Sequence, residues 1–102
     1  MDILPEPTAF EWDKGNISKN FVKHDVTPQE AEEIFSNEPL VLARDAEHST
    51  VHGRRYFALG RTKSGRKLFA TFMIRSKKIR IISIRDMTKA EEDAYEDFEK
   101  NS

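Results

Sequence analysis

The chain has no cysteine among its 102 residues, and it has only four glycines and four prolines. Without thiols it can form neither disulfides nor thiolate metal sites, and we expect a cytoplasmic protein. No run of 18 apolar residues occurs, which argues against a membrane-spanning helix, and the first residues lack the pattern of a signal peptide. The three histidines are scattered, so we expect no bound metal and no cofactor.

Acidic residues are missing from one long stretch of the sequence. Val51 to Arg85 contains eleven Lys and Arg but no Asp or Glu, whereas residues 1–50 hold four basic and eleven acidic side chains. Residues 86–102 hold two basic and seven acidic side chains. Clustered cations attract polyanions such as nucleic acid. Alternatively, the acidic flanks pack beside the basic stretch and cancel most of its charge.

Hydrophobic periodicity and capping signals predict two helices near the N-terminus. Asp13 can cap a helix that runs to about His24, with an apolar face formed by Ile17, Phe21 and His24. The run Thr27-Pro28-Gln29-Glu30 is a capping box with proline at the first helical position, which predicts a second helix that ends before Pro39.

After this point the hydrophobic period changes from 3.6 to 2, which indicates strands. The predicted strands are Leu40–Arg44, Arg55–Gly60, Lys67–Ile74 and Lys78–Arg85, with residues 45–53 as a polar loop. A second capping box at Thr88 predicts a final helix whose inward residues are Ala94, Tyr95 and Phe98. We therefore predict a single α+β domain with a core at about residues 9–98: two helices, an antiparallel sheet of about four strands, and one helix.

Several short motifs occur in a fixed order along the chain. They are Phe10-Glu11-Trp12-Asp13, Asn20, Lys23-His24-Asp25-Val26, Arg80-Ile81-Ile82-Ser83-Ile84-Arg85, Thr88, Glu91 and Tyr95. The ordered set resembles the BrnT family, toxins of bacterial type II toxin–antitoxin pairs. The chain departs from the family pattern at Asp25, Ile84 and Asp86, where the family commonly has Gly, Ala and a basic residue.

The resemblance implies a RelE-like fold and a metal-independent endoribonuclease that inhibits translation. It also implies neutralisation by a ribbon–helix–helix (BrnA-like) antitoxin. In that family the antitoxin binds operator DNA, with the toxin as co-repressor, so operator DNA would be reached only through the antitoxin.

RNA cleavage without a metal needs a proton acceptor for the attacking 2′-hydroxyl, positive charge on the phosphorane and a proton for the leaving oxygen. Arg80 and Arg85 are our first candidates, because the guanidinium fork pairs with phosphate oxygens. Positions five apart on a regular strand point to opposite faces, so a bulge or the strand end must bring them together. Alternatively, Arg80 pairs with a helix carboxylate, and Arg85 pairs with Asp86 or Glu91.

Further candidates for catalysis are Lys23, His24 and Tyr95, although core packing is an alternative for His24 and Tyr95. The candidates for RNA contact are Arg55, Arg61, Arg66, Lys14 and His48. Two other functions stay open: a cleavage-deficient module that acts as an RNA- or antitoxin-binding co-repressor, which Asp86 motivates, and a basic face that docks only protein.

Overall fold

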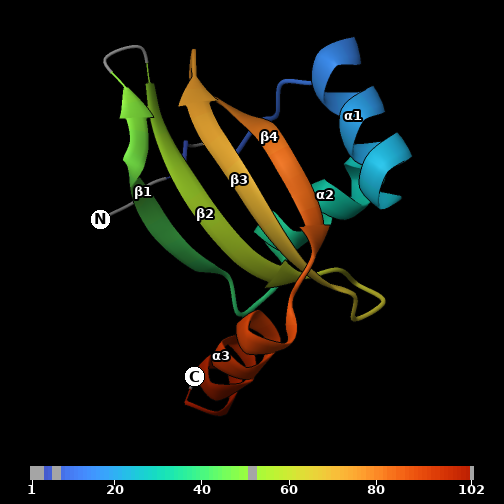
Figure 1. Cartoon of the computed structure of the whole chain (residues 1–102), viewed down its shortest axis with the longest axis vertical. Helices are drawn as coiled ribbons and strands as arrows, with labels where there is room; N and C mark the ends of the chain where they lie inside the picture. Colours follow the sequence, from blue (N-terminus) through green and yellow to red (C-terminus); the bar gives the residue numbers. More distant parts are fainter. Residues whose placement is uncertain (1–3, 6–7, 51–52, 102) are drawn as a thin grey trace.

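Two helices, four antiparallel strands and a last helix follow one another along the chain (Figure 1). The computed structural model describes residues 4–5, 8–50 and 53–101, and only the backbone of residues 21, 22 and 48–50. Its elements are α1 (Lys14–His24), α2 (Pro28–Ser36), β1 (Val41–Thr50), β2 (Gly53–Arg61), β3 (Lys67–Arg75), β4 (Lys78–Asp86) and α3 (Lys89–Lys100). The predicted α+β class and element order are confirmed.

The strands form one sheet in the order β1-β2-β3-β4, and each neighbouring pair is antiparallel. β1 is longer than predicted, because residues 45–50 belong to the strand and not to a loop. It is a polar edge strand whose register with β2 shifts between Asp45 and Thr50. Polar residues and irregular pairing are typical of edge strands, and they hide the periodicity that the prediction used.

The hydrophobic core lies between the sheet and α2. Ala31, Ile34 and Phe35 of α2 are buried, and they meet strand residues such as Ala58 and Phe72, which are fully buried. Gly60 allows the closest approach, since a Cβ there would lie 2.9 Å from the Cβ of Ile34. The opposite face of the sheet, turned toward the viewer in Figure 1, is covered by none of the described helices.

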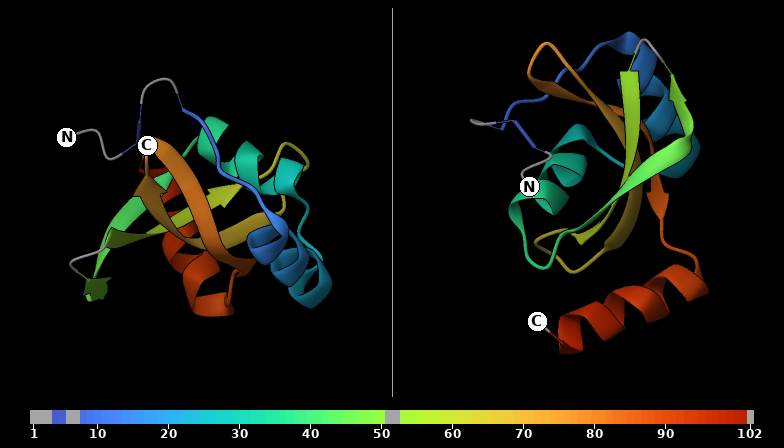
Figure 2. Two further views of the ribbon diagram at one scale, coloured as in Figure 1. Left: turned by 90° about the horizontal axis from the view of Figure 1, so that it is seen from above. Right: turned by 90° about the vertical axis from the view of Figure 1, so that its left-hand side faces the viewer.

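The other two helices lie at the margins of the sheet. α1 runs alongside β4, and α3 lies across one end of the sheet (Figures 1 and 2). α3 meets the sheet along a narrow line, so it buries only Tyr95, and the predicted inward positions of Ala94 and Phe98 are wrong: Ala94 is exposed and Phe98 is 53% exposed.

The side chains that α1 buries in the described part of the structure are polar, and the side chain of Phe21, also predicted to face inward, lies outside that part. Asn16 and Asn20 are 3% and 2% exposed, whereas Ile17, which was predicted to face inward, is 36% exposed. Asn20 Oδ1 accepts a hydrogen bond of 3.0 Å from the backbone N–H of Ile84, and its Nδ2 donates to Asn16 O at 2.7 Å. The prediction failed because α1 packs against the backbone of an edge strand, which offers hydrogen bonds to asparagine.

β4 contains a bulge close to that contact. Thr71 is paired with Ser83 and Phe72 with Ile81, so Ile82 is an extra residue in β4. A bulge of this kind changes which side chains share a face of the sheet. Asn20 binds the strand two positions after the extra residue, at Ile84.

Replacing Asn20 by leucine should therefore destabilise the protein. Asn20→Leu keeps the side-chain volume but leaves the Ile84 N–H unpaired beside a buried side chain, a loss of about 1–3 kcal/mol. Urea unfolding measures the change, with Ser18→Ala, an exposed site on α1, as the control. Equal stability of Asn20→Leu and the parent would show that the contact does not hold β4.

Candidate functional site

The face of the sheet away from α2 carries most of the predicted arginines. The register of the strands assigns one set of side chains to this face. We call it the open face. On β2, β3 and β4 its residues are Arg55, Phe57, Leu59, Arg61, Lys67, Phe69, Thr71, Met73, Arg75, Lys78, Arg80, Ser83 and Arg85, and on β1 the register adds Val41, Ala43 and Asp45. Most of these residues are half-buried, whereas Ala43, Arg75 and Lys78 are exposed and Asp45 is buried.

The bulge in β4 brings Arg80 and Arg85 to the same face. Arg80 is paired with Met73 and Arg85 with Phe69, and these two residues of β3 are four apart, so they share a face. On a regular strand Arg80 and Arg85 would point to opposite faces. The bulge thus supplies the interruption that a shared site requires.

Arg85 is held in a fixed orientation by three groups. Its Nη1 and Nη2 donate to the two carboxylate oxygens of Glu91 at 2.8 and 3.1 Å, and Nη1 also donates to Asp86 O at 3.1 Å. The guanidinium carbon lies 4.4 Å from the centroid of the Phe69 ring, a cation–π distance. The hydrogen bond from Arg85 keeps the pKa of Glu91 below its usual value. The Arg85 side chain remains 36% exposed.

Arg80 is bound by carboxylates of the segment that leads into α1. It donates to Asp13 at 2.8 and 3.2 Å and to Glu11 at 3.4 Å, and Arg75 donates to the same Glu11 oxygen at 2.7 Å. The hydrogen bond from Arg80 lowers the pKa of Asp13. The Arg80 side chain is 20% exposed, so it is less accessible than that of Arg85.

Three carboxylates of α3 each approach a cation of the open face. Glu91 pairs with Arg85, Glu96 with Lys67 at 3.0 Å, and Glu99 lies 3.8 Å from Arg61. The alternative interpretation of the charge pattern is therefore met in part, since acidic flanks do pair with the basic strands, and attraction of a polyanion stays a prediction.

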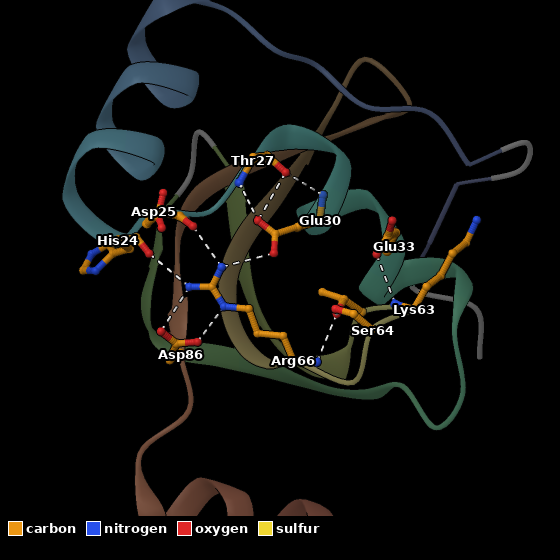
Figure 3. Close-up of polar contacts among 10 residues, drawn as sticks. His24, Asp25, Thr27, Glu30, Glu33, Lys63, Ser64, Arg66 and Asp86 are labelled. Carbon is orange, nitrogen blue, oxygen red and sulfur yellow. Dashed lines mark hydrogen bonds and ion pairs between the residues drawn. The ribbon is translucent and has the colours of Figure 1, made fainter.

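Arg66 lies outside the open face, in the turn between β2 and β3. Figure 3 shows its guanidinium surrounded by oxygen atoms from three parts of the chain. It donates to both oxygens of Asp86 at 2.8 and 3.1 Å, to Glu30 at 3.1 Å, and to the backbone oxygens of Asp25 and His24 at 2.8 and 3.2 Å. An RNA phosphate could reach Arg66 only by displacing several of these partners.

The remaining candidates are spread over the molecule. Lys14 is exposed at the start of α1, while Lys23 and His24 lie at its end, where His24 is close to Asp86. Tyr95 is fully buried and its hydroxyl donates to Pro39 O, so α3 would have to move before this phenol could meet a substrate. His48 lies within β1, and its side chain is outside the described part of the structure.

Two features of the open face were not predicted from the sequence. The first is the pair Phe57 and Phe69, which we had not singled out. Phe57 and Phe69 alternate along their strands with Ala58 and Ala70. Because the phenylalanines and the alanines are all apolar, this alternation alone does not say which pair faces the core. The second is the role of Glu11 and Asp13 in binding Arg80.

The described residues 4–5, 8–50 and 53–101 include no group of three His, Asp or Glu side chains that could hold a metal ion. None of the helices described there combines the length and apolarity needed to cross a membrane.

The fold and the site define a small α+β domain that presents arginines on an uncovered sheet face. A family model described as a ribonuclease toxin, BrnT, of type II toxin–antitoxin systems matches residues 12–91. The chain belongs to this family, as its short motifs predicted. The family implies an RNA substrate and an antitoxin partner. A search of curated proteins found no match.

The Arg66 cluster predicts a specific dependence of stability on pH. The hydrogen bond from Arg66 lowers the pKa of Asp86. Burial alone would raise the pKa of Glu30, but hydrogen bonds from Thr27 and Arg66 outweigh it and lower the value. Groups with a depressed folded-state pKa stabilise the protein above their ordinary pKa, here 3.8 and 4.5. That contribution is lost as the pH falls through the folded-state values.

Arg66→Met should therefore cost about 2 kcal/mol at pH 7 and much less near pH 3, where the unfolded chain has taken up protons and the folded carboxylates begin to do so. Thermal unfolding at both pH values measures the two differences, with Arg54→Met, an exposed arginine, as the control. A difference in Tm of the same size at both values would contradict this account.

Proposed function

We propose that this toxin is an active, metal-independent endoribonuclease whose site is the open face around Arg85. The observation that carries the proposal is the β4 bulge, which turns Arg80 and Arg85 to one uncovered face. The 2′-oxygen attacks the adjacent phosphorus and the P–O5′ bond breaks. The 2′-hydroxyl proton goes to a base, and the leaving 5′-oxygen takes up a proton.

In this proposal Arg85 stabilises the charge that develops on the phosphorane, and Arg80 orients the phosphate. Lys23 and His24 remain proposed for phosphate contact and proton transfer, with Tyr95 available only if α3 moves. Arg55, Arg61 and Lys14 would bind the flanking RNA, Arg66 would do so only after its intramolecular partners are displaced, and His48 stays a prediction.

The carboxylates that already pair with these cations do not prevent RNA binding. Ion pairs between partly exposed side chains contribute only about 0–1 kcal/mol each. A strand of RNA offers several phosphates at once, and each contact also releases counterions. Phosphates can therefore displace Glu91, Glu96 and Glu99, so these carboxylates of α3 compete with RNA for the cations of the open face.

The same family membership supports the rest of the proposal. We infer a cytoplasmic toxin that inhibits translation, is neutralised by a ribbon–helix–helix antitoxin and co-represses its operon with it, without binding operator DNA directly. A second candidate is a cleavage-deficient module that binds RNA or antitoxin. Asp86 favours it, because this acid stands where the family commonly has a basic residue.

Arg85→Ala should lower RNA cleavage at least about tenfold, since it removes the main cation at the phosphorane. Cleavage of single-stranded RNA by purified toxin with EDTA present measures the effect. Arg54→Ala is the control. It removes the same charge from an exposed arginine next to Arg55, and its cleavage rate should stay close to that of the parent. Intact RNA with the folded parent would support the binding module instead.

Removing charge from α3 should strengthen RNA binding. The double variant Glu96→Gln with Glu99→Gln frees Lys67 and Arg61, so we expect severalfold tighter binding of an uncleavable RNA in low salt. The control, Asp93→Asn with Asp97→Asn, removes the same charge from exposed positions of α3. If both double variants gain equally, net charge rather than competition explains the result.

A further inference from the structure

We propose that Phe57 and Phe69 form a platform on which bases of single-stranded RNA stack, beside Arg85 on the open face. The ligand follows from the ribonuclease function proposed above, and the platform adds a base-binding subsite to it. The site would take unpaired nucleobases of any identity, because every base offers a flat π-face.

The two rings lie next to each other on neighbouring strands. Their centroids are 5.3 Å apart and their planes are inclined by 36°. Phe57 is paired with Thr71 and Phe69 with Leu59, which places both on the side opposite α2. Their neighbours Ala58 and Ala70 point to the core and are fully buried. The pair is thus presented by two central strands of a rigid sheet.

The core does not use these rings. Among the described residues, neither Phe57 nor Phe69 belongs to the buried cluster or to the hydrophobic residues packed against it. Phe35 and Phe72, in contrast, pack edge to face inside the core, with centroids 5.2 Å apart. Two half-buried aromatic rings on an uncovered face therefore need another explanation than folding.

Charge complementarity points to RNA as the occupant. The rings are framed by cations of the same face: Arg55, Arg61, Lys67, Arg75, Arg80 and Arg85. These cations already have partners within the chain, such as Glu96 for Lys67 and Glu91 for Arg85, and a purely apolar partner would take such ion pairs out of water without offering new hydrogen bonds. RNA supplies both halves, with phosphates for the cations and bases for the rings. The Arg85 guanidinium already lies over Phe69, and a guanidinium plane is itself a surface on which a base can stack.

The proposed platform would also help to position the substrate for cleavage. In-line attack requires the ribose and phosphate to be held in one conformation. A base fixed on Phe57 or Phe69 would anchor a nucleotide next to Arg85 without reading its hydrogen-bonding edge. Bases in a duplex are already stacked on their neighbours, so this site requires a single-stranded substrate.

The test compares two probes with the same number of phosphates. One is a 2′-O-methyl oligoadenylate of about eight nucleotides, within the range bound by similar stacking sites, and it cannot be cleaved because the 2′-hydroxyl is blocked. The other is an abasic oligomer of equal length. Fluorescence anisotropy measures their affinities for the parent, Phe57→Leu, Phe69→Leu and the control Phe98→Leu, whose ring lies on α3.

We expect the parent to bind the base-bearing probe about tenfold more tightly than the abasic one, and each platform variant to lose most of that preference. Affinity for the abasic probe and the salt dependence should stay unchanged, because no phosphate contact is lost. Phe69→Tyr should retain the preference, which separates loss of the ring from loss of folding. Phe98→Leu should behave as the parent.

Equal affinity of the parent for both probes would overturn the platform, and so would platform variants that keep the preference. Variants that weaken antitoxin binding but leave the RNA preference intact would also overturn it, because the face would then be a protein-docking surface. If Phe57→Leu and Phe69→Leu both cleave RNA with an unchanged KM, the platform proposal fails but the ribonuclease proposal stands. If the parent binds RNA in a base-dependent way but does not cleave it, the platform stands and the ribonuclease proposal fails.

Discussion

The site depends on one extra residue in β4. Ile82 shifts the alternation of the strand, so that Ile81 and Ile84 both face the core while Arg80 and Arg85 both face away from it. A regular strand could satisfy only one half of this arrangement, because one arginine would enter the apolar layer under α2. Burying an unpaired guanidinium there would cost far more than the ladder irregularity that a bulge introduces.

The acidic flanks of the sequence pair with its basic stretch in the folded protein. Acidic residues before and after the basic stretch return to it, through Glu11 and Asp13 at one margin and through α3 at the other. These pairs lie near the surface, where each stabilises the fold only slightly. They therefore orient the side chains at little cost, and the proposed function requires that RNA phosphates can replace them.

Local signals predicted much of this molecule. Both capping boxes and the strands β2 to β4 follow from spacing within a few residues, and they form as predicted. The bulge, by contrast, lies beside a hydrogen bond between Asn20 and Ile84, which are 64 positions apart, and no local pattern contains that contact. The predicted inward positions of Ile17, Ala94 and Phe98 were wrong because α1 and α3 each pack against a margin of the sheet, where apolar residues need not point inward.

Asp86 illustrates why a substitution must be placed in space before its effect is judged. It follows Arg85 in sequence, which suggests a negative charge beside the site. In the register, however, it is paired with Leu68, a core-facing residue, so its side chain leaves the opposite face of the sheet from Arg85. There it binds Arg66, which also reaches Glu30. The acid thus belongs to a cluster that links β4 to α2 through Arg66, and the carboxylate that pairs with Arg85 is Glu91.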